Sequence, residues 1–139
     1  MTLATNAENC TAGLMKRLQF IILGYSKGET DPECLPCVLC LRSLDQSSWK
    51  AWVYIDESYK LTMTSPENQF CDWANDFYDA LAQMHTMQPH DQDKRFSELC
   101  NLSVGPIRTI RSGTIRPLVQ PDSSLEFRAA LQSILSETD

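Results

Sequence analysis

Three regularly spaced cysteines are the first candidates for chemistry in this sequence. Cys34, Cys37 and Cys40 form a Cys-x2-Cys-x2-Cys run, a spacing that can supply thiolates to zinc or to an iron–sulfur cluster. The residues between them are Leu, Pro, Val and Leu, whereas metal-binding loops need glycine and polar residues. In a strand, Cys37 and Cys40 would also point to opposite faces. We therefore favour buried structural cysteines over a metal site or a redox pair, and predict no cofactor.

Other residues that could act as catalysts lack the partners that catalysis needs. His85 and His90 are the two histidines of the chain, and both are expected to be exposed near a proline-broken loop. Cys71 lies near the start of a predicted helix, where the helix dipole could lower its pKa, but Asp72 adjoins it and no glycine-rich oxyanion turn accompanies it. We therefore expect a protein that is not an enzyme. A cysteine-dependent enzyme or metal-binding protein is the alternative.

Basic residues are concentrated between positions 94 and 116, where Glu98 is the one acid, although the chain carries a net charge of −6. Arginines beside turn amides suit phosphate or carboxylate groups, but the Gly-x4-Gly-Lys-Ser/Thr phosphate loop is absent. The alternative is that these charges keep an edge strand soluble. The candidate anion-binding residues are Lys94, Arg95, Arg108, Arg111 and Arg116.

Trp52 and Tyr54 are candidates for binding a protein partner. In the alternating segment 49–56 they fall on the same side as Lys50 and Asp56, opposite the apolar residues. Exposed Trp and Tyr residues are common energetic centres of protein interfaces. The alternative, weighted equally, is a sheet that helices cover on both faces.

The elements that would position these residues begin with a helix over residues 66–87. Ser65 is its expected cap and Pro66 its first residue, and five apolar residues recur at spacings of three and four. This apolar stripe comprises Phe70, Trp73, Phe77, Leu81 and Met84.

Three segments before this helix predict strands joined as a meander: residues 37–43, 49–56 and 59–64. For the N-terminal segment we favour a helix over residues 7–23, although residues 18–25 are rich in strand formers and are an alternative strand.

Three elements are expected after the long helix. Residues 91–100 predict a short helix, and residues 107–119 a hairpin that turns at Ser112–Gly113 and pairs Ile110 with Ile115 and Ile107 with Leu118. Pro117 lacks an N–H donor, which predicts an edge strand. Ser123 and Glu126 form a capping box for a last helix that ends near residue 136. Its expected buried side comprises Phe127, Ala130, Leu131, Ile134 and Leu135.

The bulk composition is that of one globular domain spanning residues 1–139, with 42% hydrophobic and 22% charged residues. No apolar run approaches the ~20 residues of a membrane span, and the first residues show no export signal. We therefore expect a cytoplasmic protein whose six cysteines are reduced. The acidic net charge argues against general nucleic-acid binding.

These elements predict an α+β fold: an antiparallel sheet of about five strands, made of a three-strand meander and a C-terminal hairpin, packed against three or four helices. Their order, the chain's size and its acidity resemble the small dimeric chaperones of type III secretion systems, without a shared motif. We expect a small, soluble, non-enzymatic protein-binding module (an adaptor, chaperone, inhibitor or immunity-type protein) that is a homodimer. The alternative is a nucleic-acid or phosphoanion binder that uses the basic segment.

Overall fold

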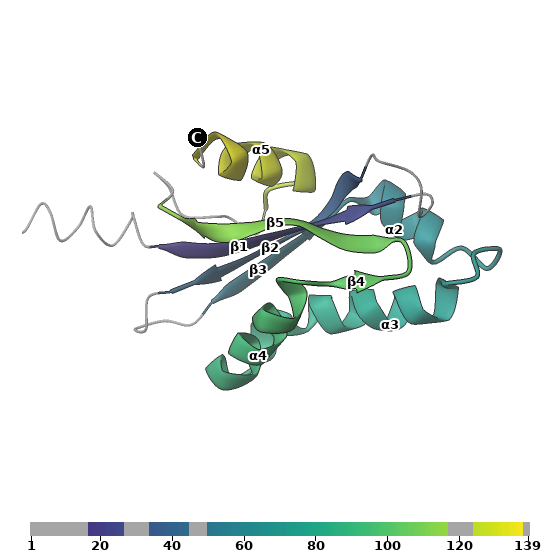
Figure 1. Cartoon of the computed structure of the whole chain (residues 1–139), viewed down its shortest axis with the longest axis horizontal. Helices are drawn as coiled ribbons and strands as arrows, with labels where there is room; N and C mark the ends of the chain where they lie inside the picture. Colours follow the sequence, from purple (N-terminus) through teal and green to yellow (C-terminus); the bar gives the residue numbers. More distant parts are fainter. Residues whose placement is uncertain (1–16, 27–33, 45–49, 117–123, 138–139) are drawn as a thin grey trace, which may run out of the picture.

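Five antiparallel strands form the centre of the structure, in the order β3-β2-β1-β5-β4 (Figure 1). The structure is a computed structural model, which describes residues 17–26, 34–44, 50–116 and 124–137. The expected α+β class, with a five-stranded antiparallel sheet and helices packed on it, is confirmed. The strands are β1 (Leu18–Tyr25), β2 (Leu35–Ser43), β3 (Ala51–Ile55), β4 (Ser103–Val104) and β5 (Ile107–Ile115).

Helices cover both faces of this sheet (Figure 1). Side chains alternate along β1, so that Ile21 and Leu23 face one layer while Phe20 and Ile22 face the other. Because both faces are buried, β1 and β2 are apolar over most of their length. The first layer comprises α2 (Glu57–Met63), α3 (Cys71–Ala82), the 3-10 turn η1 (Met84–Thr86) and α4 (Pro89–Leu99), and the second comprises α5 (Phe127–Glu137).

The N-terminal described segment is strand β1, so the favoured helix over residues 7–23 is wrong from Leu18 onward and the alternative strand is confirmed. β1 pairs with β2 on one side and with β5 on the other. The local pattern of residues 18–25 fits a helix or a strand. Pairing with strands distant in the sequence therefore determines that this segment is a strand. Residues 7–16 lie outside the described residues.

The expected strand over residues 59–64 is also wrong, because this segment belongs to helix α2. The side chain of Asp56 caps the helix by accepting a hydrogen bond from the Ser58 N–H at 3.0 Å. Met63 is fully buried whereas Leu61 is 71% exposed, as a short surface helix requires. The three-strand meander consequently comprises β1, β2 and β3.

The expected turn at Ser112–Gly113 lies inside strand β5, so the Ile110–Ile115 pair is wrong. The β4–β5 hairpin turns instead at Gly105, whose φ of +57° is left-handed. Gly113 serves a different purpose, since a Cβ there would lie 3.1 Å from the Phe20 ring. Ile107 pairs with Tyr25 on one side and with Val104 on the other, so the expected Ile107–Leu118 pair is wrong as well. Pro117 lies outside the described residues, so its expected edge position stays a prediction.

The long helix is shorter than expected, because α3 begins at Cys71 and ends at Ala82. Asn68 ends the preceding turn by accepting the Phe70 N–H at 2.8 Å, so Ser65 and Pro66 do not start the helix. Of the expected stripe, Leu81 and Met84 are fully buried. The other members, Phe70, Trp73 and Phe77, are half-buried on the flank of the core.

The two remaining helices are confirmed. α4 matches the expected helix over residues 91–100, and α5 the expected last helix. Phe127, Ala130 and Ile134 are buried against the sheet, Leu131 is half-buried, and Leu135 is exposed, which corrects one member of the expected buried side. Ser123 of the expected capping box lies outside the described residues. No helix in the described part of the chain is both long enough and apolar enough to span a membrane.

Candidate functional site at the β3 edge

Strand β3 is the last strand at one side of the sheet, and half of its backbone groups point away from the sheet. The Ser43 N–H donates to the Lys50 carbonyl at 2.9 Å, and the Asp56 N–H donates to the Cys37 carbonyl at 2.8 Å. Because partners alternate along an antiparallel ladder, the even-numbered residues of β3 bond to β2. The N–H and C=O groups of Ala51, Val53 and Ile55 therefore face outward, where no other described strand pairs with them.

This edge lacks the features that normally protect an exposed strand. Such features are charged side chains, proline, a bulge or a very short strand. The β3 sequence, Ala-Trp-Val-Tyr-Ile, contains no charge and no proline, and its register with β2 is unbroken. At the other side of the sheet, β4 has only two residues. β5 next to it carries Arg108 and Arg111 and a register shift. The β3 side is thus the less protected edge of the described sheet, with Val53 and Ile55 half-buried there and Ala51 4% exposed.

A groove follows the N-terminal half of β3 on the α3 side of the sheet. It has a volume of about 390 Å³ and is lined by the segment 50–54 together with Ala82 and His85. The Nδ1 of His85 lies 2.9 Å from the Ala82 carbonyl, to which it donates a hydrogen bond, so the imidazole is held at the end of α3.

A second groove follows the C-terminal half of β3 on the α5 side. It has a volume of about 430 Å³ and is lined by residues 54–57 and 125–128. Arg128 of α5 lies 3.9 Å from Asp56 across this groove. Side chains of an added strand alternate between the two faces of a sheet. The two grooves therefore offer space on both faces for the side chains of a strand that pairs with β3.

Trp52 and Tyr54, the expected exposed aromatic residues, are 7% and 5% exposed. They lie in the core cluster between the sheet and α5, so the alternative of a sheet covered on both faces is the one observed. Lys50 lies over the Trp52 ring, 5.3 Å from its centre. Both aromatic residues also line the grooves, where they form part of the floor rather than a protruding surface.

The outward backbone groups of Ala51, Val53 and Ile55 are the feature that sequence reasoning missed. The segment 49–56 was predicted as a strand, but its pattern carries no information about which strand ends the sheet. The edge signals in the sequence, Pro117 and the charges of the basic segment, concern a different strand.

Comparison of the chain with known protein families, characterised proteins and solved structures finds no match. A function must therefore be inferred from the geometry of the β3 edge and from the distribution of charges and thiols around it.

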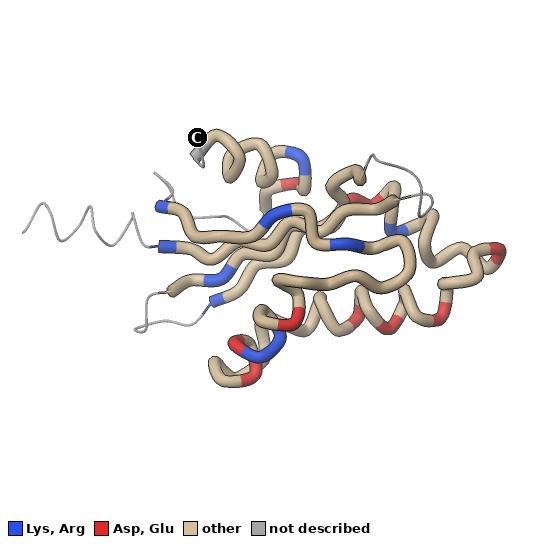
Figure 2. Tube along the Cα trace, in the orientation of Figure 1, with Lys and Arg blue, Asp and Glu red and all other residues tan. Residues whose placement is uncertain are grey.

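The expected basic patch is divided between two elements (Figure 2). Arg108 and Arg111 lie on β5, whereas Lys94 and Arg95 lie on α4. On α4 these two cations share the helix with three acids, Asp91, Asp93 and Glu98. All charged residues within the described strands are arginines, while acids are spread along α3 and α4 (Figure 2). The positive charge is thus a property of the sheet rather than of residues 94–116 as a whole.

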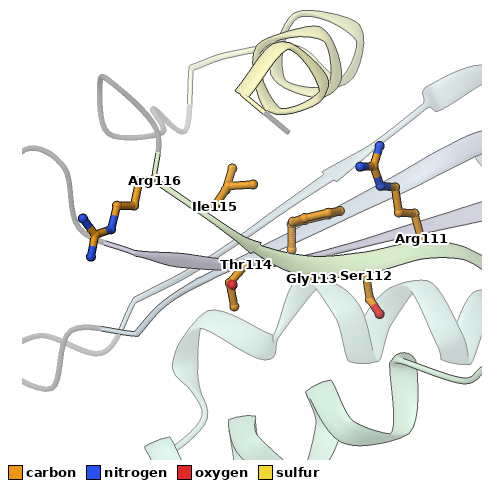
Figure 3. A pocket seen from close by; sticks show the side chains of 7 residues that line it. Arg111, Ser112, Gly113, Thr114, Ile115 and Arg116 are labelled. Carbon is orange, nitrogen blue, oxygen red and sulfur yellow. The ribbon is translucent and has the colours of Figure 1, made fainter. Parts of the chain in front are cut away.

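Arg111 and Arg116 line a third groove of about 390 Å³ together with Ser112 and Thr114. Figure 3 shows the two side chains at opposite ends of this groove, with Arg111 directed upward, to the side of Ile115, and Arg116 directed downward and to the left. Arg111 also lies 5.9 Å from the centre of the Phe20 ring. This arrangement does not enclose a small anion, but it suits an extended chain of negative charges.

The third arginine within the described strands, Arg42, has a structural role. Its side chain is buried, forms an ion pair with Asp93 of α4, and lies 5.0 Å from the centre of the Phe96 ring. These contacts join β2 to α4.

The cysteine run lies mostly in the core. Cys37 sits at a register shift between β1 and β2, where Val38 pairs with Leu23 and Pro36 with Gly24. Cys37 and Cys40 therefore lie in the same core cluster, which corrects the expectation of opposite faces. Burial raises the pKa of each thiol to about 12.

The other candidate ligands do not complete a metal site in the described part of the chain. Cys34 is half-buried, and His85 and His90 are exposed. Among the described residues, no group of three His, Cys, Asp or Glu side chains is close enough to hold a metal ion. The thiols of Cys37, Cys40, Cys71 and Cys100 are not in disulfides, and Cys10 lies outside the described residues.

Proposed function

We propose that this chain is a non-enzymatic protein-binding module that binds an extended segment by strand addition to β3. The observation that supports this proposal is the outward row of N–H and C=O groups on Ala51, Val53 and Ile55, in a strand with no protective charge, proline or bulge. In strand addition, main-chain hydrogen bonds supply affinity and pockets for alternate side chains supply specificity. The two grooves beside β3 provide such pockets.

A displayed library of random linear peptides tests this function directly. Selection on the purified protein is expected to enrich peptides that alternate apolar and polar residues and contain no internal proline, because such peptides complete the ladder and fill both grooves.

A matched pair of variants locates the binding to the edge. Val53→Pro removes one outward N–H and leaves the bonds to β2 in place, because the N–H of Val53 points away from β2. It is expected to weaken peptide binding by about tenfold or more, since one hydrogen bond is lost and the ring obstructs the incoming strand. Val53→Thr keeps the N–H and the shape and should bind normally. Failure of a monomeric chain to enrich any peptide, or equal binding by both variants, would contradict the proposal.

A second candidate function, binding of an extended polyanion along β5, is supported by the arginines that line its groove. A labelled single-stranded oligonucleotide of mixed sequence is expected to bind at low salt and to dissociate as salt rises. Arg111→Gln with Arg116→Gln should abolish this binding, whereas the matched pair Lys94→Gln with Arg95→Gln on α4 should not. Absence of binding at low salt would eliminate this candidate.

A further inference from the structure

The free edge of β3 is complementary to itself. If a second copy of the chain pairs antiparallel with β3 about a two-fold axis at Val53, then Ala51 lies opposite Ile55 of the second copy and Val53 opposite Val53. These are the residues whose N–H and C=O groups face outward. In this register every outward group of β3 therefore has a partner, and none is left against solvent.

The charges that flank β3 fit the same register. Lys50 precedes the strand, and Asp56 and Glu57 follow it. Antiparallel pairing at Val53 places Lys50 opposite Asp56 of the second copy at both ends of the interface. A parallel arrangement would instead place like charges side by side. Charges at the rim of an interface select its register and orientation more than they add affinity.

The aromatic residues of β3 are a third feature that fits this antiparallel register. The register that pairs Val53 with itself places Trp52 opposite Tyr54 of the second copy, twice by symmetry. Aromatic cross-strand neighbours stabilise antiparallel pairs. Both residues already line the grooves at this edge, so the contact extends a surface that is present in the single chain.

We propose that the strand bound by β3 is β3 of a second copy, which makes the chain a two-fold symmetric dimer with one continuous sheet across the interface. This inference rests on the proposed function, because it names the occupant of the same edge. A foreign peptide and a segment of the chain outside the described residues are the other possible occupants, and the experiment below separates them from the dimer.

Light scattering during gel filtration of the full chain gives the first measurement. The expected mass is 31.6 kDa, twice the 15.8 kDa of one chain. Val53→Pro is expected to elute at 15.8 kDa, and Val53→Thr at the mass of the dimer.

Amide hydrogen exchange measured residue by residue by NMR gives the second measurement, and it includes a check on folding. In the dimer, the N–H groups of Ala51 and Ile55 should be protected together with those of Trp52 and Tyr54. In Val53→Pro, Ala51 and Ile55 should exchange rapidly, while Trp52 and Tyr54 stay protected because they bond to β2.

Each other result overturns the dimer in a distinct way. A dimer that Val53→Pro leaves intact uses another surface. A monomer that still binds selected peptides at β3 overturns the dimer but leaves the proposed function in place. A monomer in which Ala51 and Ile55 are protected at every concentration has its edge covered by its own chain, and then both proposals fail.

Discussion

At the scale of single residues, the buried thiols of Cys37 and Cys40 should make the free energy of unfolding depend on pH in the alkaline range. Both side chains are 0% exposed, and burial raises the pKa of each from 9.0 to about 12. Below pH 9 the thiols are protonated in both states and their stabilisation is complete. Above it the unfolded chain loses protons that the folded chain retains, so stability falls as pH rises from 9 towards 12.

Urea unfolding at about pH 8 and about pH 10 measures this effect, with an expected loss of about 1.4 kcal/mol for each thiol. The variant Cys37→Ala with Cys40→Ala should lose less stability over this range. Part of the dependence should remain, because burial also raises the pKa of Tyr78. An unchanged dependence in the double variant would show that these thiols are not the cause.

The same burial bears on the alternative of a cysteine-dependent enzyme or metalloprotein. The thiolate is both the nucleophile and the metal ligand, and a pKa of about 12 keeps Cys37 and Cys40 protonated at neutral pH. We expect a thiol reagent at neutral pH to modify the half-buried Cys34, Cys71 and Cys100 and to leave these two unmodified until the chain unfolds. Mass spectrometry of the labelled peptides gives the result. Rapid labelling of Cys37 in the folded protein would reinstate that alternative.

Substitutions of Gly105 measure how much the left-handed backbone conformation of the β4–β5 turn costs a residue other than glycine. Its φ is +57°, and a Cβ at this position would lie 3.0 Å from the ring of Phe70. Gly105→Ala and Gly105→Asn both add the Cβ, but Asn tolerates the left-handed region better. We expect Ala to reduce the free energy of unfolding by about 1 kcal/mol more than Asn. Equal losses in urea unfolding would assign the whole cost to the contact with Phe70.

At the scale of elements, the packing of α5 on the sheet can be tested with two adjacent alanines. Ala130 is 2% exposed in the cluster that contains Trp52 and Tyr54, whereas Ala129 faces solvent. Ala130→Leu should overpack this contact and cost about 1–3 kcal/mol. Ala129→Leu should change stability by less than about 0.5 kcal/mol. Similar effects of the two substitutions on thermal unfolding would contradict the observed docking of α5.

Helices α4 and α5 were predictable from the sequence because their signals are local. Pro89 opens α4, and Phe127, Ala130 and Ile134 repeat at helical spacing on one side of α5. Strand β1 was not predictable in the same way, since an apolar segment buried on both faces fits helical and strand patterns alike. Its state depends on pairing with β2 and β5, and β5 lies more than 80 residues further along the chain.

The candidate site was predictable only in part. The strand that contains Ala51, Val53 and Ile55 was recognised, but the order β3-β2-β1-β5-β4 is set by long-range pairing that leaves no local pattern. The turn residues Ser112 and Gly113 show the same limit, because Gly113 is required by the approach of Phe20 rather than by a turn. The expected hairpin was therefore wrong because close packing between distant segments, and not a turn, requires glycine at position 113.

At the scale of the whole molecule, the charge is divided between layers. Acids are spread along helices α3 and α4, while the charges within the described strands are all positive. The basic segment of the sequence therefore forms two separate surfaces, because α4 and β5 are distinct elements with strand β4 between them. Only the surface on β5 is expected to bind a polyanion, and that binding should weaken as salt rises. The surface on α4 is expected to show no such binding.

If two copies share one sheet, the stability of the molecule depends on its concentration. Unfolding then separates the copies, so a tenfold increase in protein concentration should stabilise the dimer by about 1.4 kcal/mol, visible as a higher urea midpoint. Val53→Pro should unfold at the same midpoint at every concentration, since it removes the pairing at the β3 edge but keeps the bonds to β2. Val53→Thr should follow the unmodified chain. A midpoint of the unmodified chain that does not change with concentration would mean that each copy is stable alone and that β3 does not pair with a second copy in solution.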